Sequence, residues 1–379
     1  MRLLLLNITA GGISGGYKNY LDNLLPIITK NKNISELFIV IPKIISFQHL
    51  KQCITSDIDF NKEKFVFIQY KRLRQIKSII TKISPDIIYI PTARYIKIRN
   101  IPIVSAVQNM WPLAWNNKNY PLIEKLKYIA LKKITKSAIN KSDHIIAPSN
   151  FVYSYLIDKM HISKDKISQV YFGCMNIKNC VKPSIISKDI MKKFIFSTGS
   201  IEPYRGLEDL LYAMSNQSLK QTDNIYLVIA GHLRKTMTNY YKKLEKMARQ
   251  INPNIIWLFN LKKEEMSWCY KNCAVFVMTS RVEACPNIVL EAMANGCLCI
   301  STDNPPMPEF FKDSALYYKA GDHQTLSMHI SDILNWSDDK KSEYKNRALL
   351  RSRDFSWDIC AEQTVNVFEN VIKKYKHKQ

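Results

Sequence analysis

The sequence predicts an α/β protein with two doubly wound domains, each a parallel sheet covered by helices on both faces. The first observation is length, because 379 residues exceed what a single hydrophobic core usually organises. The second is that short apolar runs without strict alternation recur along the chain, as is typical of strands buried on both faces. The third is that polar stretches with helical character separate these runs, which predicts βαβ connections.

The expected strands form one group in each half of the chain. A polar stretch between Ile177 and Lys192, which contains Pro183, separates the groups. We expect a first domain over residues 1–185, a second over residues 186–356, and a last helix from Trp357 to about Lys374 within residues 357–379. The predicted strands are Arg2–Asn7, Leu37–Ile41, Phe65–Gln69, Ile87–Ile90, Ile103–Val107 and His144–Ala147, then Lys193–Ser197, Ile225–Ala230, Ile255–Phe259, Ala274–Met278 and Cys297–Ser301.

Composition indicates a folded protein without a membrane span. Hydrophobic residues make up 46% of the chain, which is typical of a globular protein. The nine cysteines are scattered, and their spacing completes no zinc site, so we interpret them as reduced thiols of a cytoplasmic protein. The apolar start, Met1–Leu6, is too short for a signal peptide. No run reaches the roughly 18 apolar residues that span a bilayer, so any membrane contact is expected to be peripheral.

The positive charge is concentrated in the first half. Residues 1–190 hold 29 Lys plus Arg against 11 Asp plus Glu, a net of +18, whereas the remaining residues hold 26 against 21, a net of +5. This asymmetry predicts an anionic partner for the first half. Aromatic residues (Trp111, Trp115, Tyr120) and a second basic cluster (Lys71, Arg72, Arg74, Lys77) lie in the same half.

The stretch from Leu122 to Ile139 has helical periodicity and two interpretations. In the first, its apolar residues pack on the core while its lysines are solvated. In the second, charge and aromatic residues of the whole half bind an anionic lipid surface. The predicted core-facing residues are Ile123, Leu126, Ala130, Ile134 and Ala138, and the lysines opposite them are Lys125, Lys132 and Lys136.

The most informative segment is Arg281–Gly296. It places Glu283 in a loop, Pro286 at a helix start, Glu291 inside the helix and Gly296 just past its end. The N-terminus of such a helix is suited to a phosphate, and a carboxylate in its second turn can accept hydrogen bonds from sugar hydroxyls. An amphipathic helix with solvated glutamates would not explain a glutamate in the loop just before it. The segment therefore predicts a nucleotide-sugar site.

This segment resembles the Glu-x7-Glu signature of retaining glycosyltransferases of family four, as found in bacterial surface-polysaccharide synthesis. The resemblance implies the GT-B fold: two Rossmann-like doubly wound domains facing a cleft, with a C-terminal helix that crosses back to the first domain. It also implies that residues 1–185 bind the acceptor and residues 186–356 the nucleotide sugar. Besides Glu283 and Glu291, the helix start would contribute Pro286, Asn287 and Ile288 to the donor site.

Further landmarks follow the family in chain order. Gly15 and Gly16 end a glycine-rich loop after the first strand, where family members contact the donor. Gln108 and Asn109 occupy positions where many members have His-Asp, so a hydrogen-bonding group remains but a titratable one is lost. A polar loop after a buried strand is an equally good interpretation of this pair.

In the second domain, Gly199 follows a strand and Arg205 precedes a helix. Family members place an Arg and a Lys here to bind the diphosphate. Arg205 fills the Lys position, and its fork of donors suits phosphate oxygens. Ser200 stands where the Arg is expected, so the sequence predicts either one cation fewer or a backbone donor in its place.

The resemblance implies transfer of a sugar with retention at the anomeric carbon. Arg205 would stabilise the leaving diphosphate, Glu283 would orient the donor sugar, and Glu291 would hold the ribose. No protein nucleophile is assigned, and no metal or other cofactor is expected. Asp57 and Asp59 match the Asp-x-Asp of metal-dependent transferases only by chance.

The expected partners are a nucleotide-sugar donor, a lipid-linked glycan acceptor and an anionic membrane surface on the cytosolic face of the inner membrane. Nucleic acid is not an expected partner. Two alternatives stay open: a nucleotide-sugar epimerase of the same fold, and a basic nucleic-acid-binding protein. Neither explains residues 281–296.

Overall fold

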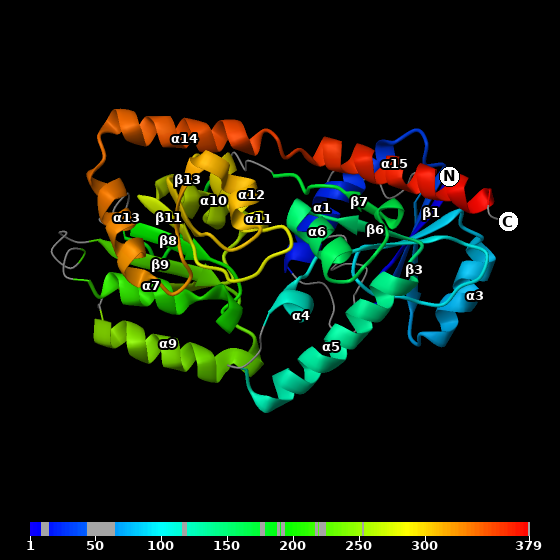
Figure 1. The fold of residues 1–379 in the computed structure, drawn as a ribbon, viewed down its shortest axis with the longest axis horizontal. Helices are drawn as coiled ribbons and strands as arrows, with labels where there is room; N and C mark the ends of the chain where they lie inside the picture. Colours follow the sequence, from blue (N-terminus) through cyan, green and yellow to red (C-terminus); the bar gives the residue numbers. More distant parts are fainter. Residues whose placement is uncertain are drawn as a thin grey trace. The chain divides into compact units, whose positions relative to one another are not determined.

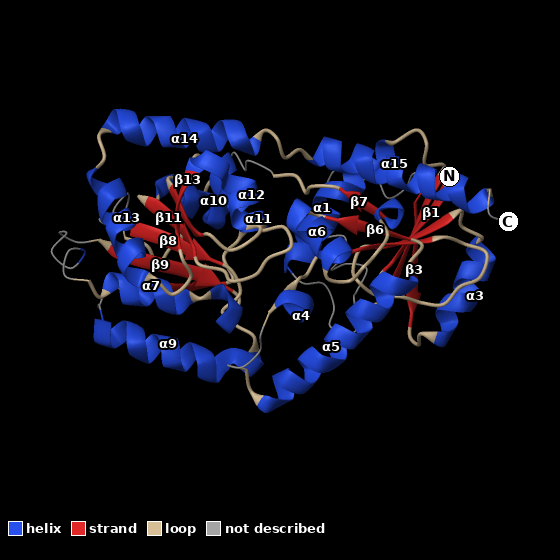
Figure 2. Ribbon diagram, in the orientation of Figure 1, coloured by secondary structure: helices blue, strands red, loops and turns tan. Residues whose placement is uncertain are grey.

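The computed structural model describes residues 1–8, 15–43, 65–115, 120–174, 179–187, 190, 194–216, 219, 225–251 and 254–377. They form two compact units, shown in Figures 1 and 2. The first consists of Met1–Ala114, Pro121–Gly173 and Ser356–Gln379. The second consists of Trp115–Tyr120 and Cys174–Phe355.

The first unit has a seven-stranded parallel sheet in the order β3-β2-β1-β4-β5-β6-β7. The strands are β1 (Arg2–Leu6), β2 (Glu36–Pro42), β3 (Phe65–Tyr70), β4 (Ile87–Ile90), β5 (Ile103–Ala106), β6 (His144–Ala147) and β7 (Ile167–Gln169). The helices are α1 (Gly15–Lys30), α3 (Arg74–Ile83), α4 (Trp111–Ala114), α5 (Leu122–Lys141), α6 (Asn150–Asp158) and α15 (Trp357–Lys376), with a 3₁₀ turn at Lys164–Lys166.

The last helix, α15, belongs to this first unit, as the expected fold requires. Its first residue, Trp357, stacks on Phe172 with ring centroids 5.9 Å apart. Phe368 packs on Tyr89 of β4 at 5.0 Å. Gly173 has no side chain where a Cβ would lie 2.2 Å from the backbone nitrogen of Trp357. The helix therefore docks by close aromatic packing that leaves no room for a side chain at residue 173.

The second unit has a six-stranded parallel sheet in the order β10-β9-β8-β11-β12-β13. The strands are β8 (Phe194–Thr198), β9 (Tyr226–Gly231), β10 (Ile255–Phe259), β11 (Val275–Met278), β12 (Cys299–Thr302) and β13 (Ala315–Tyr318). The helices are α7 (Leu207–Met214), α9 (Thr238–Ile251), α10 (Lys263–Asn272), α11 (Asn287–Ala294), α12 (Met307–Phe311), α13 (His323–Asn335) and α14 (Asp338–Ser352); 3₁₀ turns lie at Pro203–Arg205, Lys235–Met237 and Lys312–Ser314.

Both sheets confirm the predicted doubly wound architecture. All the predicted strands are present, with ends that differ by at most two residues. In each sheet the strand order reverses once, between β1 and β4 in the first unit and between β8 and β11 in the second. Open α/β sheets bind ligands outside the carboxyl ends of the strands at this reversal. In the second unit, a ligand site is therefore expected where β8 and β11 end.

Of the two interpretations of α5, the one in which its aliphatic side packs on the core is wrong. Ile123, Leu126 and Ile134, expected in the core, are at least 48% exposed, and Ala130 is exposed as well. Only Ala138 of the predicted set is buried. The side of the helix that faces the unit instead carries Glu124, Tyr128, Thr135, Ala138 and Ile139. Tyr128 packs edge-on against Trp111 of α4, with ring centroids 5.1 Å apart, and this contact fixes which side turns inward.

Candidate functional site

The second unit gathers polar side chains where β8 and β11 end. Gly199 follows β8, and Thr279 and Ser280 follow β11. Arg205 closes the 3₁₀ turn Pro203–Arg205, and Gly206 then adopts a left-handed conformation (φ 61°) that leads into α7. The Thr279 hydroxyl donates to the carbonyl of Arg205 at 2.5 Å. The two loops are thus fastened together at the reversal of strand order.

Arg205 and Glu283 form a nearly buried ion pair in this cluster. Nη1 of Arg205 donates to the Glu283 carboxylate and, at 3.1 Å, to the Ser280 hydroxyl. The two side chains are 15% and 13% exposed. Burial acts to lower the pKa of the Arg205 guanidinium, but the Glu283 carboxylate and the Tyr204 hydroxyl outweigh it and hold that pKa above its usual value. Arg205 is therefore a permanent cation in a poorly hydrated place.

Not every N–H group of the Arg205 guanidinium has an acceptor. A guanidinium has five N–H groups in a fixed fork. Within the described residues, Nε of Arg205 is buried and has no hydrogen-bond partner. A buried unsatisfied donor is costly unless a ligand pairs with it. This geometry suits an anion rich in oxygen atoms.

Gly199 makes room for that guanidinium. Its φ of 135° is one that side-chain-bearing residues rarely adopt. A Cβ at this position would also lie 3.0 Å from both Cζ and Nε of Arg205. The carbonyl of Gly199 lies against Gly231 at the end of β9, where a Cβ would come within 1.9 Å of it. Two glycines thus let β8, β9 and Arg205 approach closely.

Helix α11 begins beside this cluster and ends as predicted. Pro286 is the residue just before the helix, and its carbonyl accepts from the N–H of Val289 at 2.9 Å. Gly296 closes the helix in the left-handed region (φ 66°), and its N–H donates to Met293 at 3.0 Å. At the N-terminus, Oδ1 of Asn287 is buried without a hydrogen-bond partner among the described residues. The helix start thus offers an acceptor and the positive end of its dipole.

Glu291 lies in the second turn of α11 in a poorly hydrated environment. Burial raises the pKa of its carboxyl from 4.5 to about 7, although the Tyr270 hydroxyl and the charge of Lys263 act to lower it. The Tyr270 hydroxyl donates to Oε2 at 3.0 Å. Among the described residues, no donor reaches the other oxygen, Oε1. That oxygen can accept a hydrogen bond from a ligand hydroxyl.

A second buried ion pair lies next to the first. Nη2 of Arg281 lies 2.6 Å from Oδ1 of Asp209, and the two side chains are 17% and 6% exposed. The Asp209 carboxylate also accepts from the N–H of Gly321 at 2.9 Å and from the Tyr318 hydroxyl at 3.3 Å. Because Asp209 connects α7 to β13 and to the loop after it, we interpret this pair as stabilising the fold.

The residues expected from the first domain lie in the first unit. Gly15 and Gly16 are exposed at the start of α1, and a Cβ at Gly15 would meet nothing within 4 Å. The rest of the glycine-rich loop, residues 11–14, lies outside the described residues. Gln108, after β5, has a buried Nε2 without a partner in the described part of the chain. Oδ1 of Asn109 instead accepts from the N–H of Trp111 at 2.9 Å, at the start of α4.

The structure therefore brings some of the predicted residues together and places others on a separate helix. Gly199, Arg205 and Glu283 form one cluster, whereas Pro286, Asn287, Ile288 and Glu291 belong to α11. Sequence reasoning did not single out Ser280 or Tyr270. Ser280 could have been found as a small polar residue at a strand end. Tyr270 lies on α10, 21 positions before its partner Glu291, so no local pattern marks it.

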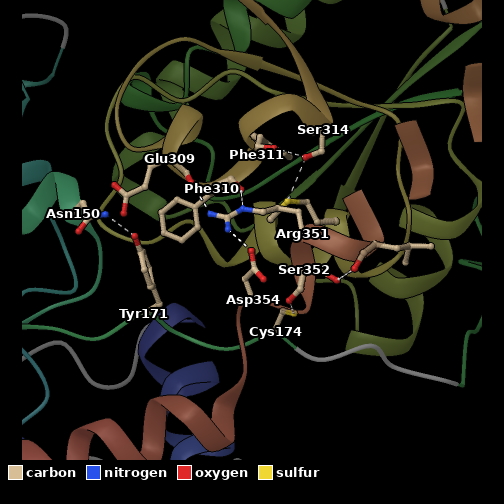
Figure 3. A network of polar contacts seen from close by, with 12 residues as sticks. Asn150, Tyr171, Cys174, Glu309, Phe310, Phe311, Ser314, Arg351, Ser352 and Asp354 are labelled. Atoms are coloured by element: carbon tan, nitrogen blue, oxygen red, sulfur yellow. Dashed lines mark hydrogen bonds and ion pairs between the residues drawn. The ribbon is translucent and has the colours of Figure 1, made fainter. Parts of the chain in front are cut away.

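Glu309, which follows the cluster in the sequence, lies on α12. Figure 3 shows Arg351 of α14 reaching the C-terminal end of this short helix. Nε of Arg351 donates to the carbonyl of Phe310 and Nη2 donates to that of Glu309, both at 2.8 Å. Arg351 also pairs with Asp354. A cation on the last carbonyls of a helix satisfies them and complements its dipole, so Arg351 ties α14 to α12.

Over the described ranges, no group of three or more His, Cys, Asp or Glu is placed to hold a metal ion. Asp57 and Asp59 fall outside those ranges. The independence from metal that the sequence predicts stays a prediction. No described helix has both the length and the apolar character to cross a bilayer.

Two family models match the chain and together cover most of it. The model described as glycosyl transferases group 1 matches residues 182–350, and the model described as glycosyltransferase family 4 matches residues 54–174. The first match contains Arg205, Glu283 and Glu291. The chain belongs to the family-four glycosyltransferases. The expectation drawn from residues 281–296 is confirmed at the level of the family.

Characterised relatives of this glycosyltransferase are distant. O-antigen chain mannosyltransferase B of Escherichia coli is 22% identical over 253 residues, which is 65% of each chain. A Campylobacter jejuni enzyme is 21% identical over 90% of this chain and 93% of its own. Its name is N-acetylgalactosamine-N,N'-diacetylbacillosaminyl-diphospho-undecaprenol 4-alpha-N-acetylgalactosaminyltransferase. The chain thus matches just under two thirds of the first relative and nearly all of the second.

Solved structures confirm the GT-B fold of this glycosyltransferase. A glycosyltransferase from Rickettsia africae has a TM-score of 0.70 at 15% identity, covering 98% of this chain and 99% of that one. Anabaena HepE in complex with UDP has a TM-score of 0.72 at 14% identity, covering 98% and 100%. At these identities the likeness shows the fold alone.

Proposed function

We propose that this glycosyltransferase moves a sugar, with retention, from a nucleoside-diphosphate sugar to a lipid-linked or growing polysaccharide, as in O-antigen or capsule synthesis. The observation that carries the proposal is the buried Arg205–Glu283 pair where β8 and β11 end, with the N-terminus of α11 beginning next to it. A permanent cation, unused N–H donors and a helix dipole converge there. Such a place binds a diphosphate and stabilises it as a leaving group.

The leaving-group charge would be distributed between Arg205 and the first turn of α11. As the glycosidic bond breaks, negative charge builds on the diphosphate oxygens. The guanidinium of Arg205 and the N-terminal N–H groups of α11 are oriented before the reaction begins, so little reorganisation opposes the step. Ser280 and Glu283 fix the guanidinium through Nη1. Removing one preorganised donor of this kind typically costs about 3–4 kcal/mol of barrier.

The two glutamates would recognise the two sugars of the donor. Glu291 would accept a ribose hydroxyl through Oε1, because Tyr270 already occupies Oε2. Glu283 would orient hydroxyls of the transferred sugar and stabilise positive charge at its anomeric carbon. Gly15, Gly16 and Gln108 would complete donor binding from the first unit, whereas Asn109 already uses Oδ1 to accept from the N–H of Trp111 at the start of α4. Attack on the same face as the leaving group gives retention without a protein nucleophile, and no cofactor is required by these groups.

The comparisons support the choice of substrates. HepE, which has the same fold, was solved with UDP and with UDP-glucose, so a UDP-sugar is favoured over a GDP-sugar. The relatives are named as mannosyl- and N-acetylgalactosaminyltransferases, which favours transfer of a hexose or an N-acetylhexosamine. The Campylobacter name includes diphospho-undecaprenol. This favours a lipid-linked acceptor, met by a peripheral enzyme on the cytosolic face of the inner membrane.

The donor site is tested by thermal-shift titration with UDP, GDP, ADP and CMP. We expect one nucleoside diphosphate to stabilise the protein by about 2.7 kcal/mol at 100 times its Kd. The gain should be lost in Glu291→Ala and kept in Glu343→Ala, which removes an exposed carboxylate of α14. If no nucleotide shifts the melting temperature, or if Glu291→Ala responds like the wild type, the donor site is misassigned.

Retention and the need for an acceptor are tested with the matching nucleotide sugar. Proton NMR of the product should show the same anomeric configuration as the donor. Consumption of donor without any acceptor, with conversion of its sugar, would instead identify an epimerase. A product of inverted configuration would contradict the proposed mechanism while leaving sugar transfer intact.

A further inference from the structure

Helix α5 exposes the apolar side that a helix of a folded protein normally buries. Five of its aliphatic side chains are between 48% and 75% exposed: Leu122, Ile123, Leu126, Ile129 and Ile134. They are a third of the fifteen large hydrophobic residues that are exposed in the described part of the chain. Scattered exposed aliphatics are ordinary, but such a concentration on one helix marks an interaction surface.

The orientation of α5 is fixed by contacts on its other side. Tyr128 packs on Trp111, and Glu124, 2% exposed, accepts from Nζ of Lys127 at 2.9 Å. Thr135 and Ala138 are buried on the same side. The helix therefore cannot turn its aliphatic side inward without burying lysines and exposing Tyr128. The apolar surface is a fixed feature of the first unit.

The exposed surface of α5 is strongly basic. The helix carries six lysines, and its only acidic residue, Glu124, is buried and paired. At 3.6 residues per turn, the five aliphatic residues span an arc of about 140°. Lys125 and Lys136 lie at one edge of this arc, Lys127 lies at the other, and Lys133 lies within it. An apolar stripe flanked by lysines is the arrangement of helices that lie in a membrane interface.

We propose that α5 docks this protein on an anionic lipid bilayer. The aliphatic side chains enter the boundary between headgroups and acyl chains, and the lysines extend to the headgroup phosphates. Like charge disfavours a second copy on the same surface, since six lysines would meet six. A nucleic acid would leave the aliphatic stripe unused, because its backbone offers charge alone. The proposal rests on the proposed function, in which the acceptor is lipid-linked, but it concerns a different surface.

A second place in the first unit also combines an exposed aliphatic side chain with basic residues. Leu73 is 61% exposed just before α3. Arg72 and Arg74, its neighbours, and Lys77 in the first turn of α3 are exposed as well. At α5 and at the start of α3, basic residues thus lie beside an exposed leucine. Binding to an anionic bilayer uses both, because the charges attract the headgroups and the apolar side chains enter the bilayer.

The test is sedimentation of the full chain with vesicles. Neutral phosphatidylcholine vesicles are compared with vesicles that contain about one third phosphatidylglycerol, at low and high salt. We expect binding to the anionic vesicles only, weakened by salt. Lys133→Gln combined with Lys136→Gln should weaken it at least tenfold, at roughly fivefold for each lysine. Leu126→Ser combined with Ile129→Ser should weaken it similarly and remove the part that resists salt.

Matched controls lie in the second unit. Met328 on α13 is 61% exposed, like Leu126, so Met328→Ser tests loss of an exposed apolar side chain elsewhere. Lys242 and Lys243 on α9 are exposed, and replacing both with Gln tests loss of two charges. Both controls should bind vesicles like the wild type. Equal loss in controls and α5 variants, or absence of binding by the wild type, would overturn the proposal.

Two readouts separate this proposal from that of the donor site. The α5 variants should keep the wild-type melting temperature and the same response to the nucleoside diphosphate. If the protein responds to a nucleotide but does not bind anionic vesicles, the docking proposal is overturned and the donor-site proposal stands. If it binds vesicles through α5 but responds to no nucleotide, the donor-site proposal is overturned and the docking proposal stands. If the Leu126→Ser, Ile129→Ser variant changes the oligomeric state in light scattering but not vesicle binding, α5 is a contact between copies and the proposal fails.

Discussion

The two units share a strand order and differ in what they place where that order reverses. Where β8 and β11 end, the second unit holds two ion pairs, Arg205–Glu283 and Arg281–Asp209, with side chains no more than 17% exposed. In the first unit, Asn7 follows β1 and is neutral and buried. The nearby buried contact is between the hydroxyls of Tyr20 and Tyr89, 2.5 Å apart. The second unit thus places ion pairs at this point, whereas Asn7, Tyr20 and Tyr89 of the first unit are uncharged.

The comparison shows that strand order determines where in the sheet a site can lie. The side chains at that place determine which ligand it can bind. At this place the second unit holds its charges in two buried pairs, and the partners of each pair come from different segments of the chain. The ion pairs described in the first unit each keep at least one exposed partner, as Lys127–Glu124 does. Its large positive excess lies on helices such as α5. Under the two proposals, charge in the second unit acts on a bound diphosphate, whereas charge in the first acts on an external surface.

The largest expected effect comes from removing the cation of the buried cluster. Arg205→Ala should lower kcat by about 10²–10³-fold, because it removes a preorganised donor to the leaving group. Steady-state kinetics at saturating donor measures the change. Arg281→Ala is the matched control: it breaks the neighbouring pair with Asp209 and should lower the melting temperature with a much smaller loss in kcat. Equal losses in kcat would remove the distinction between a functional and a structural pair.

A smaller effect is expected from filling the space next to Arg205. Gly199→Ala introduces a Cβ 3.0 Å from the guanidinium at a φ of 135°. The displaced Arg205 should cost ten- to a hundredfold in kcat, since small misplacements of a positioning group are expensive. Kinetics and a crystal structure of the variant would check this. Unchanged kcat together with an unmoved Arg205 would show that the site tolerates a side chain at residue 199.

The raised pKa of Glu291 predicts a dependence of affinity on pH. With a pKa of about 7, the carboxyl is mostly protonated at pH 6 and mostly ionised at pH 8. An ionised carboxylate is the better acceptor for a ribose hydroxyl, so nucleotide affinity should rise about tenfold from pH 6 to pH 8. Calorimetric titration across this range measures it. The rise should vanish in Glu291→Gln and shift to higher pH in Tyr270→Phe, which removes the hydrogen bond that lowers this pKa.

The same group affects stability in the opposite sense. The folded state keeps a proton on Glu291 up to about pH 7, whereas the unfolded chain releases it near pH 4.5. Its contribution to stability is therefore fully present below about pH 4.5 and is lost as the pH rises to about 7. The free energy of unfolding of the ligand-free protein should fall by up to about 3 kcal/mol over this window. If Glu291→Gln shows the same fall in denaturant titrations, another group is responsible.

Much of the fold could be predicted because both sheets are built from short, continuous apolar strands. The two strands that were missed, β7 and β13, both lie at a sheet edge. β7 is only Ile-Ser-Gln, and β13 follows a helix and a 3₁₀ turn without a clear break. An edge strand has one neighbour and needs less apolar character, so its signal in the sequence is weak. Tertiary pairing, which periodicity does not encode, defines these strands.

The side of α5 that is buried could not be predicted for a related reason. Helical spacing correctly groups Ile123, Leu126 and Ile134 on one side. It cannot say whether that side meets the core, because the ring of Trp111 decides this from outside the helix. Likewise, the sequence marks Glu291 but not Tyr270, which sets how many oxygens remain for a ligand. Periodicity and motifs identify surfaces, and long-range contacts assign their partners.

The smallest effect is expected at two neighbouring amides of the first unit, Gln108 and Asn109. Asn109 uses Oδ1 to accept from Trp111 at the start of α4, whereas Nε2 of Gln108 is buried without a partner in the described residues. Asn109→Ala should therefore lower the free energy of unfolding by about 1 kcal/mol and leave the KM for donor unchanged. Gln108→Ala should leave stability unchanged and raise that KM about fivefold, one hydrogen bond being worth about 1 kcal/mol. Denaturation and kinetics on both variants give a two-by-two comparison. A loss of stability in Gln108→Ala without a change in KM would make this amide a structural part of the first unit, and donor recognition would then lie with the second unit.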